Sequence, residues 1–179
     1  MNRDDCMIIG QYSEVVRVSN AVLWANQSAA LQFGWVAERG TNVRVKGVDV
    51  IHCQSTAISI SGFIGMRHGG SGRLSDFQFE DVVVEHFGAG SHRTFVYLEI
   101  TPNAYAMGSL GSLSNVLFRN FKVLDGTMSN RITGHDAEHM ITDITFGNLM
   151  ADGKLALDAA AARVSLNQYT RNIRFSASP

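Results

Sequence analysis

The first residues that could do chemistry are two adjacent acids, Asp4 and Asp5. Hydrolysis of a glycosidic bond needs one carboxylic acid as proton donor and a second carboxylate as base or nucleophile. Inverting enzymes separate the two by about 6.5–9.5 Å to admit a water molecule. Neighbours in a regular strand point to opposite faces, so both acids can meet one ligand only where the backbone bends. The competing interpretation is a pair of solvated acids at a charged chain end.

Aromatic and amide side chains that follow the acids are candidates for contact with a sugar. Tyr12 and Trp35 offer rings, with Trp35 placed directly after Gly34 at the end of an apolar segment. Gln32 offers an amide beside it. Burial in the core is the alternative for each ring, because tryptophan in a β-rich chain packs inside as often as it serves a ligand. These three residues are predicted substrate contacts.

A glycine-rich stretch over residues 63–73 carries Arg67 and His68. A guanidinium or an imidazole on a loop could reach a hydroxyl or carboxylate of a ligand. The alternative is a solvated loop tip. Both residues are added to the predicted substrate contacts.

Neither a metal nor an organic cofactor is expected. His135-Asp136-Ala137-Glu138-His139 has the spacing of an H-x-x-E-H zinc motif, but little helical sequence surrounds it. Cys6 and Cys53 fall in different repeats. Neither a glycine-rich nucleotide motif nor a serine-nucleophile motif is present.

The elements that must position these residues follow a repeat. Each repeat has an apolar–any–apolar strand, a small or polar residue, and usually a second short apolar strand. The turn residues are spaced by 27, 34, 39 and 28 residues, which is the range of solenoid repeats. The repeated segments cover residues 15–24, 42–53, 76–87, 115–126, 143–153 and 172–178, and their turn residues are Asn20, Gly47, Asp81, Asn120 and Asn148.

A second series of alternating strands lies between these segments, and alternation with a period of two predicts strands. Its members cover residues 6–10, 30–34, 57–62 and 94–100, with 130–133 or 163–166 as a further one. Residues 155–166 are alanine-rich and fit a helix, a tight turn or a cap.

Three short strands per repeat predict an all-β fold, a right-handed parallel β-helix of about six coils, as a single domain over residues 1–179. Insertions of loops are expected over residues 63–73 and 101–112. The runner-up is a β-sandwich or jelly roll, which would need Asn-Gly or Asp-Gly hairpin turns. Asp125-Gly126 and Asp152-Gly153 occur, but each ends a repeated segment and neither joins two mirrored strands.

The composition limits the classes of partner and the compartments that this chain is expected to have. The formal net charge of −1 gives no attraction to nucleic acid or to an anionic membrane. The segment MNRDDCMII lacks the pattern of a secretory signal, and no apolar run is long enough for a transmembrane helix. With two cysteines there is no disulfide framework. The compartment is left unassigned.

Residues 4–53 resemble the catalytic region of the dextranase and isopullulanase family of glycoside hydrolases, and more distantly the polygalacturonases. The matching features are the aspartate pair, Val22-Leu23-Trp24 at a strand end, Gln32-Phe33-Gly34-Trp35, and an Asn-Val-x-Val repeat from Asn42. The resemblance implies a β-helix in which one of Asp4 and Asp5 protonates the glycosidic oxygen and the other acts as base, with inversion. It implies an α-glucan or another polysaccharide as substrate. Related enzymes are typically secreted.

The sequence departs from that family's pattern in two ways. A third aspartate about one coil upstream of the pair has no counterpart, and neither have the family's preceding coils. We therefore expect an N-terminally truncated relative, and an inactive remnant is one form of it. An uncapped N-terminal end would expose Met7, Ile8 and Ile9, which predicts a homo-oligomer through that end. The alternative function is a non-catalytic carbohydrate-binding or structural β-helical assembly module.

Overall fold

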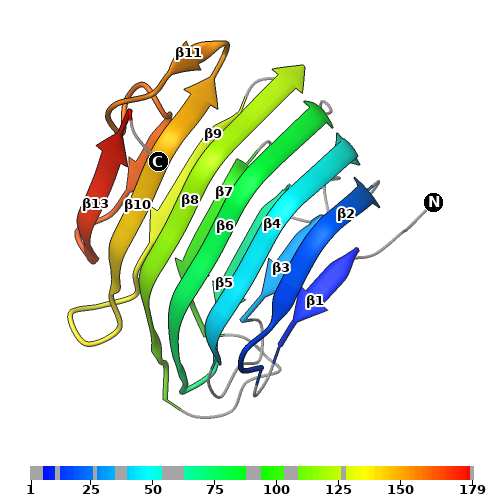
Figure 1. The fold of residues 1–179 in the computed structure, drawn as a ribbon. Helices are drawn as coiled ribbons and strands as arrows, with labels where there is room; N and C mark the ends of the chain where they lie inside the picture. Colours follow the sequence, from blue (N-terminus) through cyan, green and yellow to red (C-terminus); the bar gives the residue numbers. More distant parts are fainter. Residues whose placement is uncertain are drawn as a thin grey trace.

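The computed structural model describes residues 6–10, 13–25, 28–34, 40–53, 63–87, 94–102, 109–125 and 128–177. Within these ranges the regular structure consists of β-strands (Figure 1), and no helix there is long and apolar enough to cross a membrane. The strands are β1 (Met7–Ile9), β2 (Arg17–Ala25), β3 (Leu31–Phe33), β4 (Gly40–Cys53), β5 (Ile64–His68), β6 (Arg73–His86), β7 (Thr94–Ile100), β8 (Ser112–Asp125), β9 (Ser129–Thr133), β10 (Ile141–Ala151), β11 (Lys154–Leu155), β12 (Val164–Leu166) and β13 (Thr170–Ser176).

From β1 to β10, successive strands alternate between two sheets that face each other (Figure 1). β11 stays in the sheet of β10, and the alternation resumes with β12 and β13. The short-strand sheet has the order β1-β3-β5-β7-β9-β12. The long-strand sheet has the order β11-β10-β8-β6-β4-β2, and β13 also pairs with β10. All neighbours run parallel except β10 and β11. Neither path closes on itself, so the described fold is all-β with two open parallel sheets.

The repeat read from the sequence corresponds to this alternation. The six repeated segments form β2, β4, β6, β8, β10 and β13, as predicted. The second series forms strands of the short-strand sheet at residues 7–9, 31–33 and 94–100, and both 129–133 and 164–166 join it. Parallel neighbours also exclude the antiparallel sandwich that was the runner-up.

One loop prediction is wrong. Residues 64–68 form β5, a central strand of the short-strand sheet, and not part of a loop over residues 63–73. The segment expected as the strand, residues 57–62, lies outside the described residues. Only the flanks of the other predicted loop, residues 101–102 and 109–112, are described, and Ser112 already begins β8.

The structure also shows what the alanine-rich segment 155–166 and the Asp152-Gly153 pair form. Residues 158–163 form turns, with Ala162 N–H donating to Asp158 O at 3.0 Å, and no helix forms. Asp152 and Gly153 have φ of 50° and 72° and join the antiparallel pair β10 and β11. The expectation that no Asp-Gly pair joins two mirrored strands is therefore wrong here, because two positive φ values build the tightest hairpin turn.

The long strands bend at two fixed columns. In the first, which we call the Asn120 column, every residue has a positive φ, between 52° and 65°. Asn120 Nδ2 donates to Asp81 Oδ1 at 2.7 Å, and Asn148 Nδ2 donates to Asn120 Oδ1 at 2.9 Å. The amide of Asn120 is the largest cause that lowers the pKa of Asp81. The members of the Asn120 column are Asn20, Gly47, Asp81, Asn120 and Asn148, which are the five turn residues of the repeat.

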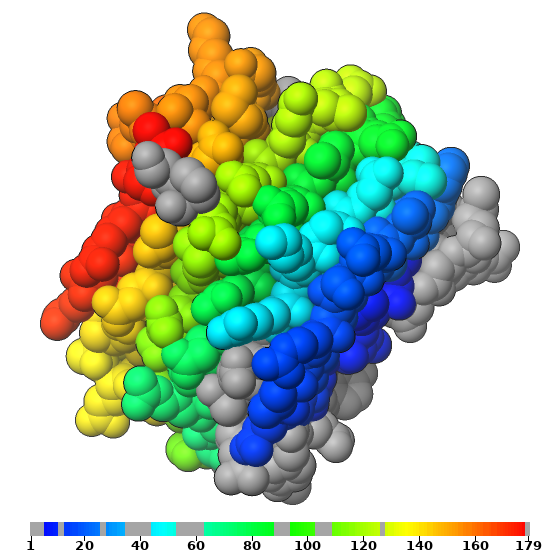
Figure 2. Space-filling model, viewed as in Figure 1, coloured from blue at the N-terminus to red at the C-terminus, as the bar shows by residue number. Residues whose placement is uncertain are grey.

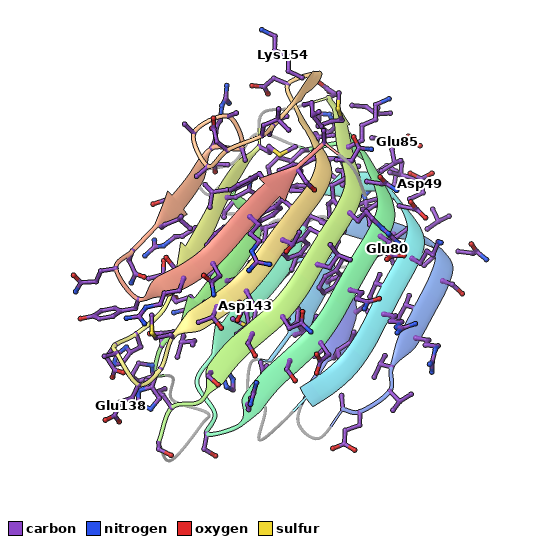
Figure 3. All side chains as sticks on the ribbon, turned by 60° about the vertical axis from the view of Figure 1, so that its left-hand side comes forward. Asp49, Glu80, Glu85, Glu138, Asp143 and Lys154 are labelled. Carbon is purple, nitrogen blue, oxygen red and sulfur yellow. The ribbon has the colours of Figure 1, made fainter. Side chains whose placement is uncertain are left out.

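A second column of positive φ lies five residues before the first in β6, β8 and β10 and continues into β13. It contains Asp76, Asn115, Asp143 and Asn172, with φ between 55° and 63°. Asn115 donates to Asp76, and Asn172 Nδ2 donates to Asp143 Oδ1 at 3.0 Å. Asp143 is labelled in Figure 3. Asn and Asp are the side chains that best tolerate the left-handed region, so both bends fall where the sequence can adopt them.

The core lies between the two sheets. Four phenylalanines from neighbouring long strands stack in a line, with ring centroids 5.3, 5.0 and 5.1 Å apart. Parallel stacking of this kind adds about 0.5–1.5 kcal/mol for each pair beyond the burial of area. The line consists of Phe79, Phe118, Phe146 and Phe175.

We expect Asn120→Ala to lower the free energy of unfolding by about 2–3 kcal/mol in chemical denaturation. Alanine loses two side-chain hydrogen bonds and adopts the left-handed region at a cost of about 1–2 kcal/mol. Asn120→Gly is the matched control, because glycine removes the same bonds without the backbone cost. Asn120→Gly should lower the free energy of unfolding by about half as much as Asn120→Ala. Equal stability of the alanine variant and the native chain would refute the role of this column.

Candidate functional site

The outer face of the short-strand sheet gathers polar side chains from adjacent strands. Along one row, cross-strand pairing places Gln32, Gly65, Tyr97, Arg131 and Ser165 side by side. A second row on the same face follows two residues later and contains Arg67, Glu99 and Thr133. Side chains alternate with a period of two, so both rows face the same way. This face is the candidate site.

At its centre Glu99 accepts contacts from three side chains. Tyr97 Oη donates to Glu99 Oε2 at 2.7 Å, and Arg67 Nε donates to the same oxygen at 3.3 Å. Arg131 Nη2 lies 3.6 Å from Glu99 Oε1, and its guanidinium lies 5.6 Å from the centre of the Tyr97 ring. We call these four residues the Glu99 cluster. Glu99 is the acceptor in every contact. Its carboxylate therefore orients the guanidiniums of Arg67 and Arg131 and the phenol of Tyr97.

The cluster is only partly accessible. The side chains of Arg67, Arg131 and Glu99 are 33%, 49% and 15% exposed, while Tyr97 is buried. Burial, followed by the hydrogen bond to Glu99, raises the pKa of Tyr97 well above its ordinary value. The phenol therefore stays protonated and acts as a donor. A ligand on this face would meet the two guanidiniums first.

The predicted substrate contacts have different placements. Gln32 and Arg67 share the outer face of the short-strand sheet. Gln32 is 5% exposed, and its Nε2 has no hydrogen-bond partner among the described residues. Asp4, Asp5, Tyr12 and Trp35 lie outside the described residues.

His68 is buried between the two sheets, unlike its neighbour Arg67. Its Nδ1 lies 3.1 Å from Gly34 O and its Nε2 lies 2.7 Å from Gly72 O. These contacts join the end of β3 to the start of β6. Gly111 packs directly against the same junction. A Cβ at this position would come within 1.8 Å of Gly72 O, so no larger residue fits there. The contacts that His68 makes are those of a structural clamp.

Sequence reasoning missed Tyr97, Glu99 and Arg131. The alternation in residues 94–100 contains the signal for the first two, because it puts Tyr97 and Glu99 on the face opposite Val96 and Leu98. Arg131 joins them only through the pairing of β9 with β7. To predict that register from the sequence, the bounds of both strands would have to be known.

A second group of side chains lies at the ends of β2, β4 and β6 in the long-strand sheet. The rings of Trp24 and His52 stack at 5.2 Å, and those of His52 and His86 stack at 5.2 Å. His86 Nδ1 lies 2.6 Å from Asp125 Oδ2. Trp24 thus belongs to the other sheet and is not part of the Glu99 cluster.

Metal ligands do not converge in the described part of the chain. No group of three or more His, Cys, Asp or Glu there could hold an ion. In the segment 135–139, His139 Nδ1 lies 2.8 Å from Asp136 Oδ1, and Asp136 also accepts the N–H groups of Glu138 and His139. Asp136 therefore orders the loop between β9 and β10, which carries Glu138 (Figure 3).

No protein-family model matches this chain, and no curated protein or solved structure matches it. The resemblance of residues 4–53 to dextranase-type enzymes therefore stays a prediction.

We expect His68→Phe to lower the free energy of unfolding by about 1–3 kcal/mol. Phenylalanine fills the volume but leaves the two carbonyl oxygens without the imidazole. His135→Phe is the matched control at an exposed position, where the imidazole lies 3.9 Å from its nearest carboxylate oxygen, and it should change stability by less than about 0.5 kcal/mol. Urea denaturation measures both. Equal effects of the two substitutions would contradict the clamp.

We expect Tyr97 to ionise later than an ordinary phenol when the folded chain is titrated with alkali. Its pKa is raised mainly by burial and then by Glu99, so Tyr97→Phe should remove the lagging part of the phenolate absorbance. Glu99→Gln should shorten the lag only in part. Because the folded pKa exceeds the unfolded value of about 10, the stabilisation linked to Tyr97 is complete below that pH and is lost as pH rises above it. A lag that persists in Tyr97→Phe would refute the assignment.

Proposed function

We propose that the two parallel sheets are sides of a right-handed parallel β-helix of about six coils. The support is the alternation of successive strands between the sheets from β1 to β10 and again from β11 to β13, together with bends that recur in the same columns. Right-handedness follows from the strong preference for right-handed crossovers between parallel strands. In such a solenoid, side chains from successive coils form continuous rows on one face.

On this fold we propose a glycoside hydrolase-like protein that binds a polysaccharide along the outer face of the short-strand sheet. The Glu99 cluster is the observation that carries the proposal. It presents two partly exposed guanidiniums, those of Arg67 and Arg131, on strands to either side of β7, and Glu99 and the buried Tyr97 phenol hold them in place. Guanidinium donors suit hydroxyl and carboxylate oxygens, and a row that crosses several strands suits a polymer. The polymer is an α-glucan or a similar polysaccharide.

Hydrolysis is assigned to Asp4 and Asp5. One of them protonates the glycosidic oxygen and the other activates water, which gives inversion. Glu99 is unsuited to the acid role because the three groups around it all act as donors. The family resemblance alone supports the assignment of the proton donor and the base to Asp4 and Asp5.

The second candidate is a non-catalytic carbohydrate-binding or structural β-helical module. It is favoured by one observation on the described strands. Glu99 is the one carboxylate among the strands of the short-strand sheet. A face with a single, fully engaged carboxylate can bind a sugar without cleaving it.

The deciding experiment measures binding and reducing-sugar release with dextran, pullulan and polygalacturonate. Arg131→Ala should weaken binding by about tenfold to a hundredfold, since it removes a charged hydrogen-bond donor worth about 1.5–3 kcal/mol when engaged. Arg44→Ala is the matched control, an exposed arginine on the long-strand sheet, and should leave binding unchanged. Asp4→Asn/Asp5→Asn should abolish release and keep binding.

Each alternative has its own outcome. Binding without release by the native chain would support the module. Release that is unchanged in the double asparagine variant would remove Asp4 and Asp5 as catalysts. No binding to any of the three polymers, or equal binding by Arg131→Ala and Arg44→Ala, would refute the face as the site.

A further inference from the structure

Beyond the bend at the Asn120 column, the outer face of the long-strand sheet gathers apolar side chains. The residues on either side of Val83 and of Lys122 are buried in the core, so Val83 and Lys122 face outward. Cross-strand pairing sets both in a row with one residue from each of three further strands, and we call it the Val83 row. Figure 2 shows β4, β6 and β8 side by side. From β2 to β10, the members of the Val83 row are Val22, Asp49, Val83, Lys122 and Met150.

This part of the outer face leaves large apolar side chains open to solvent. Val22 is 65% exposed. In the next outward positions of β4 and β8, Ile51 and Leu124 are 36% and 54% exposed. Apolar side chains gathered on one exposed face are the mark of an interaction surface.

The strands at the centre of this surface are interior strands of their sheet. β4 pairs with β2 and β6, β6 pairs with β4 and β8, and β8 pairs with β6 and β10. Their backbone hydrogen bonds are therefore made within the sheet. A partner on this surface meets side chains, as in the packing of one sheet on another.

Two opposite charges stand symmetrically about Val83. Asp49 lies one strand before it and Lys122 one strand after it, so two strand spacings, about 10 Å, separate them. In the described part of the chain neither takes part in an ion pair. Asp49 Oδ1 is buried there without a hydrogen-bond partner. A carboxylate among apolar neighbours is stabilised when a partner supplies a cationic donor.

We propose that two copies of this chain pack face to face through this surface, about a two-fold axis that passes through Val83. The axis exchanges β4 of one copy with β8 of the other, so Asp49 of each copy faces Lys122 of the other. Val22 then faces Met150, and Val83 faces its own copy. The contact is isologous and closes at a dimer. It is independent of the ligand proposed above, which lies on the other sheet.

The charges select this position of the axis. An axis through Asp49 or through Lys122 would set like charges against each other. An axis midway between β4 and β6 would set Asp49 against Val83 and Lys122 against Val22. An axis midway between β6 and β8 would set Lys122 against Val83 and Asp49 against Met150. Both intermediate positions bury charges against apolar side chains, which is costly.

The other charges near the row lie at its rim. Glu85 follows Val83 by two residues, is exposed, and is labelled with Asp49 in Figure 3. The two-fold axis carries Glu85 toward Asp81 of the other copy, at the bend. Lys46 Nζ lies 3.4 Å from Asp81 Oδ2 and offsets this repulsion. Exposed charges at such a rim contribute little, so the apolar side chains and the Asp49–Lys122 pairs decide the association.

The experiment is sedimentation velocity with light scattering from about 1 to about 300 µM. We expect the mean mass to rise with concentration and to level off at that of a dimer. Lys122→Glu should raise the dissociation constant at least about tenfold, because it sets a second carboxylate against Asp49 twice in each dimer. Arg44→Glu is the matched control. It makes the same change of charge at an exposed position of β4 before the bend and should change the constant less than about threefold.

Two further variants test the register and the axis. Asp49→Lys/Lys122→Glu restores opposite charges across the axis and should bring the dissociation constant back to within about threefold of the native value. Val83→Cys should form a disulfide-linked dimer under mild oxidation, because a residue on the axis meets its own copy. Leu117→Cys, on the outer face of β8 before the bend, is the matched control and should stay unlinked, with the native chain as background.

Each of several results would overturn the proposal. These are a monomer at every concentration, a mass that exceeds that of a dimer, and equal effects of Lys122→Glu and Arg44→Glu. Failure of the double variant to recover association, or equal crosslinking of Val83→Cys and Leu117→Cys, would do so as well. Circular dichroism of each variant separates lost association from lost folding.

Discussion

The constraint on which the rest of the structure depends is the alignment of left-handed residues in adjacent long strands. A slip of one residue between β6 and β8 would move Asn120 away from Asp81 and put a phenylalanine or an arginine at the bend. Those side chains adopt positive φ only at a cost of about 1–2 kcal/mol each. Register is thereby fixed, and with it the choice of side chains that face the core. The line of stacked phenylalanine rings is one consequence, because Phe79 and Phe118 can meet only in this register.

The sequence contained most of this information, because the bends need particular residue types. Asn, Asp and Gly at the turn positions predicted the Asn120 column, and the flanking apolar alternation predicted the long strands. The failure at β5 has a physical reason. Residues 57–62 alternate regularly, whereas β5 contains Gly65, a residue type that is depleted in strands. Its place is decided by neighbours: β7 on one side and β3 on the other.

The site was predictable by residue type but not by position. Gln32 and Arg67 were candidates from their chemistry, and they share a face. His68 was a candidate on the same grounds, yet it follows Arg67 directly and so points to the opposite side of β5, into the core. Glu99 and Arg131 come from different strands and meet only through the register of β7 and β9. A site whose residues come from strands that are far apart in the sequence leaves no local pattern in that sequence.

The two sheets place different demands on their outward side chains. Both columns of positive φ run through the long strands, where the polar side chains bond to one another across strands. Among the described residues, no positive φ falls within a strand of the short-strand sheet. Its outward side chains are therefore not needed to hold a bend, and substitution there is limited mainly by burial. A ligand-binding row is easier to accommodate on such a face, because changing Arg131 or Arg67 leaves the register of both sheets intact.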